Sequence, residues 1–159
     1  MTDSEQFDTS FGPRELRDAL GQFATGVAVV SCVSLQGEAH ASTVSSFNSV
    51  SLDPPLVLFS LANSAKSLSD WLLAPRYAVS ILHANQQEVS NQFAKALTNK
   101  WSGVNAVHGP TTGVPLIPQA LAWFECEPYA TYAGGDHTIF VGKVLSLRRR
   151  TISDNEPLL

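Results

Sequence analysis

The feature that most constrains the fold is a succession of three β-type segments that no helix separates. Residues 27–33 are apolar and rich in β-branched side chains, Gln36-Gly37 predicts a turn, and residues 40–47 predict the returning strand. Residues 56–61 predict a third, buried strand after an extended bend at residues 53–55. A doubly wound parallel sheet needs a helix after nearly every strand, so this order of elements favours antiparallel neighbours.

The rest of the chain adds further strands and three short helices. We expect strands over residues 77–82, 120–132 and 137–147, with Gly134-Gly135 joining the last two. Helices are predicted to open near Pro13, Ser67 and Asn85. The predicted fold class is therefore α+β, an antiparallel β-barrel with short flanking helices.

The chain has 159 residues, which suffices for one domain with its own core. Residues 1–10 are polar and predict a disordered tail, and residues 11–159 predict a single domain. Residues 98–118 are rich in glycine, proline and polar side chains and show no period. Because loops of about twenty residues are uncommon in compact domains, this one indicates a functional segment.

The number and distribution of charged and apolar residues limit which kinds of partner this chain can bind. Charged residues make up 15% of the chain, below the ~25% of an ordinary soluble domain, which predicts that a second copy covers part of the surface. The longest apolar runs fall far short of the ~20 residues that cross a bilayer, so we expect no membrane partner. The net charge is −4, and Lys and Arg are scattered apart from Arg148-Arg149-Arg150, so we expect no nucleic acid.

Cys32 and Cys126 each lie in an apolar run, which predicts two buried, reduced thiols. The first residues lack the basic and apolar regions of a signal peptide, so we expect a cytoplasmic protein. The usual signatures of dinucleotide sites, phosphate loops, zinc proteases and serine hydrolases are absent from the sequence. The four histidines are isolated from one another, and no metal site is predicted.

Three segments carry candidate chemistry, and each has a simpler interpretation. Residues 41–51 place small polar side chains on both faces of a strand, which suits a planar polar heterocycle or merely a solvated face. Residues 60–67 lead into a helix with Lys66 and Ser67, which suits a phosphate or merely a helix cap. Asp136-His137 follows a Gly-Gly turn, where the carboxylate would orient the imidazole or the pair would be structural only.

Taken in order, these segments match one family. Residues 20–30, 45–58 and 134–144 resemble the opening, central and closing motifs of the short-chain flavin reductases, the reductase components of two-component flavin-dependent monooxygenases. Residues 100–104 (Lys-Trp-Ser-Gly-Val) resemble that family's loop, which usually has Phe at the position of Trp101. The resemblance covers residues 13–159.

The resemblance implies an FMN-binding split barrel of Greek-key type that forms a homodimer. It implies that NADH or NADPH reduces FMN or FAD, and that a separate monooxygenase receives the reduced flavin. No side chain has to exchange protons in the hydride step, so no catalytic residue is expected. The implied flavin-binding residues are Ser45, Ser46, Phe47, Asn48 and Ser49, with Ala62, Asn63, Lys66, Ser67 and Lys100 near the phosphate, and His137 near the nicotinamide.

Relatives usually continue beyond the position of Leu159 into a short Tyr-rich strand, so we expect this chain to lack one contact to the flavin or the nicotinamide. Two rival functions share this kind of barrel. One is a tight flavin-binding electron carrier without NAD(P)H turnover. The other resembles the pyridoxamine-phosphate oxidases and would need a more basic phosphate pocket than Lys66 and Lys100 offer.

Overall fold

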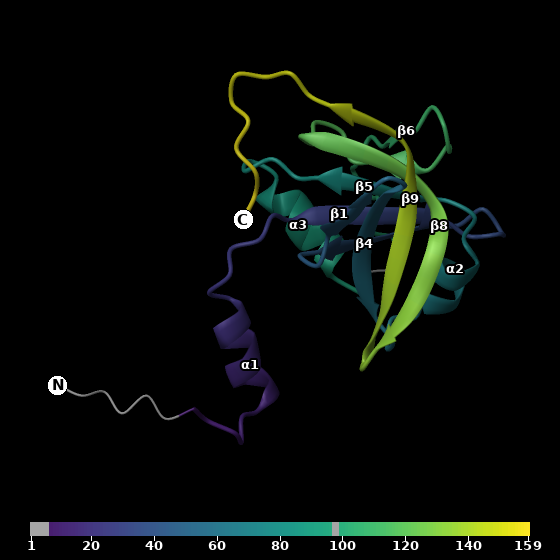
Figure 1. Ribbon diagram of the computed structural model, residues 1–159. Helices are drawn as coiled ribbons and strands as arrows, with labels where there is room; N and C mark the ends of the chain where they lie inside the picture. Colours follow the sequence, from purple (N-terminus) through teal and green to yellow (C-terminus); the bar gives the residue numbers. More distant parts are fainter. Residues whose placement is uncertain (1–6, 97–98) are drawn as a thin grey trace.

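The structure, a computed structural model, describes residues 7–96 and 99–159 (Figure 1). Most of the predicted disordered tail over residues 1–10 falls outside this range. Both the disordered tail and the single domain over residues 11–159 therefore stay predictions. The described elements, in chain order, are α1 (Pro13–Leu20), β1 (Ala28–Val33), β2 (Ala39–Val44), β3 (Asn48–Leu52), β4 (Pro55–Ala62), α2 (Leu68–Leu73), β5 (Tyr77–Ile81), α3 (Gln87–Ala94), β6 (Val107–His108), β7 (Pro115–Leu116), β8 (Ala122–Gly134) and β9 (His137–Arg149).

Seven of these strands form one antiparallel sheet in the order β2-β1-β5-β8-β9-β4-β3. Its two edge strands, β2 and β3, are neighbours in sequence, and the turn between them brings the edges together. There the Ser46 hydroxyl accepts a hydrogen bond from the Ser60 backbone N–H of β4 at 2.9 Å. The sheet curls into a barrel that is split at this seam, which confirms the predicted fold class.

The apolar run of β1 is explained by burial of both its faces. Ala28, Val30 and Cys32 point into the barrel interior, whereas Val29 packs in a second cluster with Phe93 of α3. Because alternate side chains of a strand point to opposite faces, a strand covered on both sides needs apolar residues at every position.

Four aromatic rings fill the barrel interior. Phe59 of β4 stacks on Phe140 of β9 with ring centroids 5.4 Å apart, and Trp71 and Tyr77 pack edge-on around this pair. The pairing of β4 with β9 continues to Ala62 opposite His137 at the start of β9. The β8–β9 hairpin turns at the lower end of the barrel in Figure 1. The aromatic core therefore fixes the register that places His137.

Two local predictions are wrong. The strand expected over residues 40–47 ends at Val44, and Asn48–Leu52 forms a strand of its own, β3. The chain leaves the ladder because Phe47 turns inward against Phe124, with ring centroids 5.6 Å apart. Residues 53 and 54, expected to make an extended bend, form a tight turn between Leu52 and Pro55, which are paired.

The helices are shorter than predicted, and their caps differ. Ser67 precedes α2 as expected, but its side chain makes no capping hydrogen bond, and α3 begins at Gln87, close to the predicted Asn85, with Gln86 at the capping position. α1 ends at Leu20 and buries none of its residues. Figure 1 shows α1 standing apart from the barrel on a single connecting segment.

The described part of the predicted loop over residues 98–118 contains the short hairpin β6–β7, and residue 98 lies outside the described residues. Cys32 and Cys126 are buried free thiols, as predicted, and burial raises the pKa of each to about 12. Among the described residues, no helix is long and apolar enough to cross a membrane.

Candidate functional site

A hollow of about 310 Å³ opens where the barrel is split. Three parts of the chain line it: the end of β2 with the turn that follows, the end of β4, and the start of β9. The lining residues are Ser42, Thr43, Val44, Ser45, Ser46, Ser60, Leu61, Ala62 and His137. Hydroxyls and small side chains therefore face one space beside a single imidazole.

Four of the residues predicted for flavin binding line this hollow: Ser45, Ser46, Ala62 and His137. The Ser46 hydroxyl is already committed, since it accepts from the Ser60 N–H at 2.9 Å and lies 3.4 Å from the Ser60 carbonyl. Ser45 is exposed, and no side-chain hydrogen bond of it is found in the described part of the chain. The Ser46 hydroxyl therefore joins the turn after β2 to β4, whereas the Ser45 hydroxyl is available to a ligand.

The other residues of the predicted serine segment lie outside the lining of the hollow. Phe47 is half-buried and packs against Phe124 at the edge of the barrel core. Asn48 and Ser49 are exposed on β3, and the Asn48 side-chain carbonyl accepts from the Ser49 N–H at 2.9 Å. Contact of these three residues with flavin stays a prediction.

The segment after β4 carries the predicted phosphate residues. Lys66 is exposed, and among the described residues its ammonium makes no ion pair or hydrogen bond. Ser67 is half-buried just before α2. Asn63 differs from both, because its side-chain amide is bonded to the β8–β9 hairpin.

The ammonium of Lys100 is held by two backbone carbonyls. It donates to the backbone carbonyls of Ala41 at 2.9 Å and Phe93 at 3.2 Å. Burial lowers the pKa of this amine. These two bonds tie the long loop to β2 and α3. The role of Lys100 as a second phosphate cation stays a prediction.

Asp136 and His137 form the pair that the sequence indicated. His137 Nδ1 lies 2.7 Å from a carboxylate oxygen of Asp136. This hydrogen bond and the charge of His137 lower the pKa of the Asp136 carboxyl. With Nδ1 directed at Asp136, Nε2 is the ring atom left to meet a ligand in the hollow.

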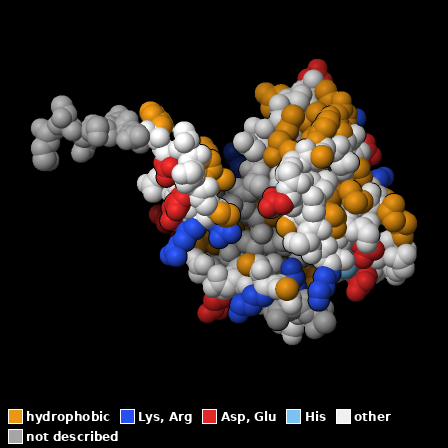
Figure 2. Space-filling view, turned by 90° about the horizontal axis from the view of Figure 1, so that it is seen from below, with side chains coloured by type: hydrophobic (Ala, Val, Ile, Leu, Met, Phe, Trp, Pro, Cys, Tyr) orange, Lys and Arg blue, Asp and Glu red, His pale blue; other side chains and the backbone are white. Residues whose placement is uncertain are grey.

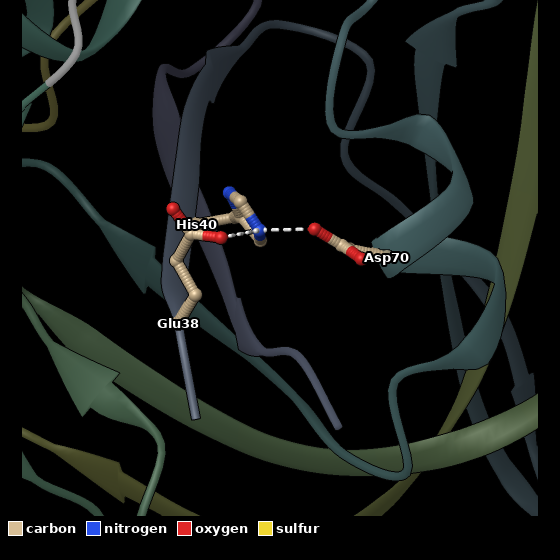
Figure 3. A group of neighbouring side chains, drawn as sticks. All are labelled: Glu38, His40 and Asp70. Carbon is tan, nitrogen blue, oxygen red and sulfur yellow. Dashed lines mark hydrogen bonds and ion pairs between the residues drawn. The ribbon is translucent and has the colours of Figure 1, made fainter. Parts of the chain in front are cut away.

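A second histidine–carboxylate contact was missed by sequence reasoning. His40 Nε2 of β2 lies 2.7 Å from Asp70 of α2 and 3.8 Å from Glu38 (Figure 3). The three groups could hold a metal ion by their spacing, but the contact already serves to tie α2 to the barrel edge. His40 and Asp70 lie 30 positions apart in the sequence, so no local pattern predicts their contact. The absence of a metal site stays a prediction.

Glu125 is the buried carboxylate of the barrel and lies away from the split. It accepts hydrogen bonds from the Thr111 and Thr112 backbone and from the hydroxyls of Thr112 and Ser146. Although burial opposes this effect, these bonds lower the pKa of Glu125. Glu125 thereby orders the β6–β7 connection beside a second hollow of about 280 Å³ that is lined mainly by apolar groups around Trp123.

The chain is similar to known flavin reductases. It is 42% identical to the FMN reductase (NADH) SmoA of Agrobacterium fabrum over 91% of this chain and 80% of that protein. It is 40% identical to the reductase component of the flavin-dependent trigonelline monooxygenase of Acinetobacter baylyi over 82% of this chain. The solved structure of the NADH:FAD oxidoreductase SgcE6 of Streptomyces globisporus, in complex with NAD and FAD fragments, matches with a TM-score of 0.82 and 38% identity over 90% of this chain and 87% of that one.

Coverage differs among the relatives. The chain spans only 43%, 60% and 42% of the length of three curated relatives from Rhizobium meliloti and Acinetobacter baylyi. The model of the flavin reductase like domain matches residues 20–159, which is most of the chain. The chain therefore belongs to the flavin reductase like domain family.

Proposed function

We propose that this chain is an NADH-dependent flavin reductase that reduces FMN or FAD and releases the product to a separate monooxygenase. The observation that carries the proposal is the hollow at the split of the barrel, where serine hydroxyls and His137 face one space. Relatives that are 38–42% identical to this chain are named as NADH-dependent flavin reductases or as the reductase component of a monooxygenase, which supports NADH as the hydride donor and an oxygenase as the partner.

The lining of the hollow fits a flavin. An isoalloxazine ring is planar and carries hydrogen-bonding atoms along one edge, so it needs small side chains and polar groups at close range. Ser42, Ser45 and Ser60 supply hydroxyls there, and Ala62 leaves room beside them. Lys66 and Ser67 stand next along the chain, where a phosphate would extend from the ring.

A bound flavin supplies the chemistry by accepting a hydride from the nicotinamide ring. The chain has to hold the two rings in contact, at about 3–3.5 Å, and keep water away. His137 fits the nicotinamide side, because Asp136 fixes its ring and leaves Nε2 free to hydrogen-bond the nucleotide. No step requires His137 to give up a proton, so its role is binding and orientation.

The test is a steady-state assay of NADH and NADPH oxidation with riboflavin, FMN and FAD supplied in turn. We expect purified protein to lose flavin on gel filtration and to oxidise NADH only when flavin is added back. Protein that keeps its flavin and does not oxidise NADH would instead be an electron carrier of the same fold, and the proposal would fail.

We further propose a homodimer, since α1 presents an apolar face that this chain does not cover. Leu16 and Leu20, one helical turn apart on α1, are 46% and 63% exposed, and Phe23, just beyond the end of α1, is 78% exposed. A helix of eight residues is marginal in water on its own, so it needs a packing partner. Hydrophobic side chains also gather on the barrel face seen in Figure 2, and a second copy would offer such a surface to α1.

Light scattering of the full chain tests this arrangement. We expect a mass of twice 17.1 kDa, and a monomer when Leu16→Asp and Leu20→Asp are combined. Leu35→Asp is the control, because Leu35 is 65% exposed in the β1–β2 turn. A wild-type monomer would contradict the homodimer, and a dimer that survives both changes would contradict the role of α1. The two buried free thiols support a cytoplasmic location, which we also propose.

A further inference from the structure

Asn63 makes three hydrogen bonds to the β8–β9 hairpin. Its backbone N–H donates to the Asp136 carbonyl at 2.8 Å. Its side-chain amide donates to the Gly135 carbonyl at 3.2 Å, and its side-chain carbonyl accepts from the Thr138 hydroxyl at 2.7 Å. Both ends of the side chain are therefore occupied by a segment more than 70 residues away in sequence.

These bonds extend the sheet past its last pair. The ladder between β4 and β9 ends with Ala62 opposite His137. Beyond it the hairpin turns at Gly135, whose φ of +67° lies in the left-handed region that favours glycine. None of the described strands flanks this tip beyond the ladder, so Asn63 supplies the contacts that hold it against β4.

The tip matters because it carries His137. Asn63 holds the residues on both sides of His137, namely Asp136 through its carbonyl and Thr138 through its hydroxyl. Asp136 in turn bonds the imidazole at 2.7 Å. A shift of the tip would therefore move the imidazole relative to the hollow.

We propose that Asn63 is a positioning residue for the nicotinamide side of the site, and not a ligand of the flavin phosphate. This inference rests on the proposed function. It predicts that a change at Asn63 affects the use of NADH, whereas a change at Lys66 or Ser67, on the phosphate side, affects the binding of flavin. A loosened tip would weaken the contact of His137 with the nucleotide equally in the ground state and the transition state, so KM for NADH should rise while kcat stays the same.

The test compares Asn63→Ala, Thr138→Val and Thr138→Ser. Valine has the shape of threonine but lacks the hydroxyl that donates to Asn63, whereas serine keeps it. We expect Asn63→Ala and Thr138→Val to raise KM for NADH about tenfold, with kcat and KM for flavin within about twofold of wild type. Thr138→Ser should behave as wild type. An unchanged KM for NADH in both Asn63→Ala and Thr138→Val would overturn the proposal, as would a KM for flavin that rises instead.

A second readout does not depend on turnover. Amide hydrogen exchange of residues 134–138 in flavin-free protein should be faster in Asn63→Ala and Thr138→Val than in wild type and Thr138→Ser. If wild-type protein oxidises no NADH, the proposed function fails, and this measurement still decides whether Asn63 holds the tip. Equal exchange in all four proteins would show that it does not.

Discussion

Replacing Ser46 by alanine should weaken the seam of the barrel. The Ser46 hydroxyl accepts from the Ser60 N–H at 2.9 Å and makes a longer contact of 3.4 Å to the Ser60 carbonyl. Alanine removes both contacts and changes little else, because the side chain keeps its Cβ. The Ser60 N–H points to the split side of β4, away from its partner strand β9, so it would have no protein acceptor there.

The size of the effect follows from burial. Leaving a fully buried donor without a partner costs about 1–3 kcal/mol. Ser46 and Ser60 are both half-buried, so water can reach the freed N–H and the lower end of that range applies. We therefore expect a loss of about 1 kcal/mol in the free energy of unfolding, and a fall of about 2–4 °C in Tm for a chain of this length.

Urea unfolding followed by fluorescence measures this loss, and KM for FMN measures the effect on the hollow. Ser45→Ala is the matched control, because Ser45 lines the same hollow and is exposed. We expect only Ser46→Ala to lower stability, whereas both changes should raise KM for FMN. Equal stability of Ser46→Ala and Ser45→Ala would refute the inference that this hydroxyl holds the seam.

Three further outcomes are expected. Glu125 has a folded-state pKa below its ordinary value, so its contribution to stability is present above the unfolded pKa and is lost as pH falls through the folded value. Acid titration of the unfolding free energy should show this loss below about pH 4.5 in wild type, with a smaller slope in Glu125→Gln. Lys66→Ala should raise KM for FMN more than KM for riboflavin, which has no phosphate, and equal rises would contradict the phosphate assignment. Trp101 Nε1 is buried without a hydrogen-bond partner among the described residues. Trp101→Phe should therefore leave the free energy of unfolding within about 1 kcal/mol of wild type. A larger loss in thermal or urea unfolding would point to a missed partner.

The sequence predicted those parts of the fold that a local pattern determines. The β-branched run of β1 and the Gly-Gly signal before β9 are such patterns, and both strands lie within a few residues of their expected limits. The bond between Asp136 and His137 was also predictable, since the two residues are adjacent.

The remaining features depend on contacts between distant segments. Phe47 was assigned to the flavin segment, but the barrel core draws its ring inward against Phe124. The family resemblance implied a phosphate role for Lys100 and Asn63, and it did not predict that backbone carbonyls of β2 and α3 bind Lys100 or that the hairpin binds Asn63. A single sequence carries no local signal for such partners.

The most direct test of the site is the kinetic effect of His137→Ala, with His108→Ala as control. His108 is an exposed histidine of β6 that does not line the hollow. KM for NADH and KM for flavin should be measured separately in both variants. We expect His137→Ala to raise KM for NADH at least about tenfold and to leave KM for flavin within about twofold of wild type, whereas His108→Ala should change neither. Loss of flavin affinity with unchanged NADH kinetics in His137→Ala would contradict this expectation.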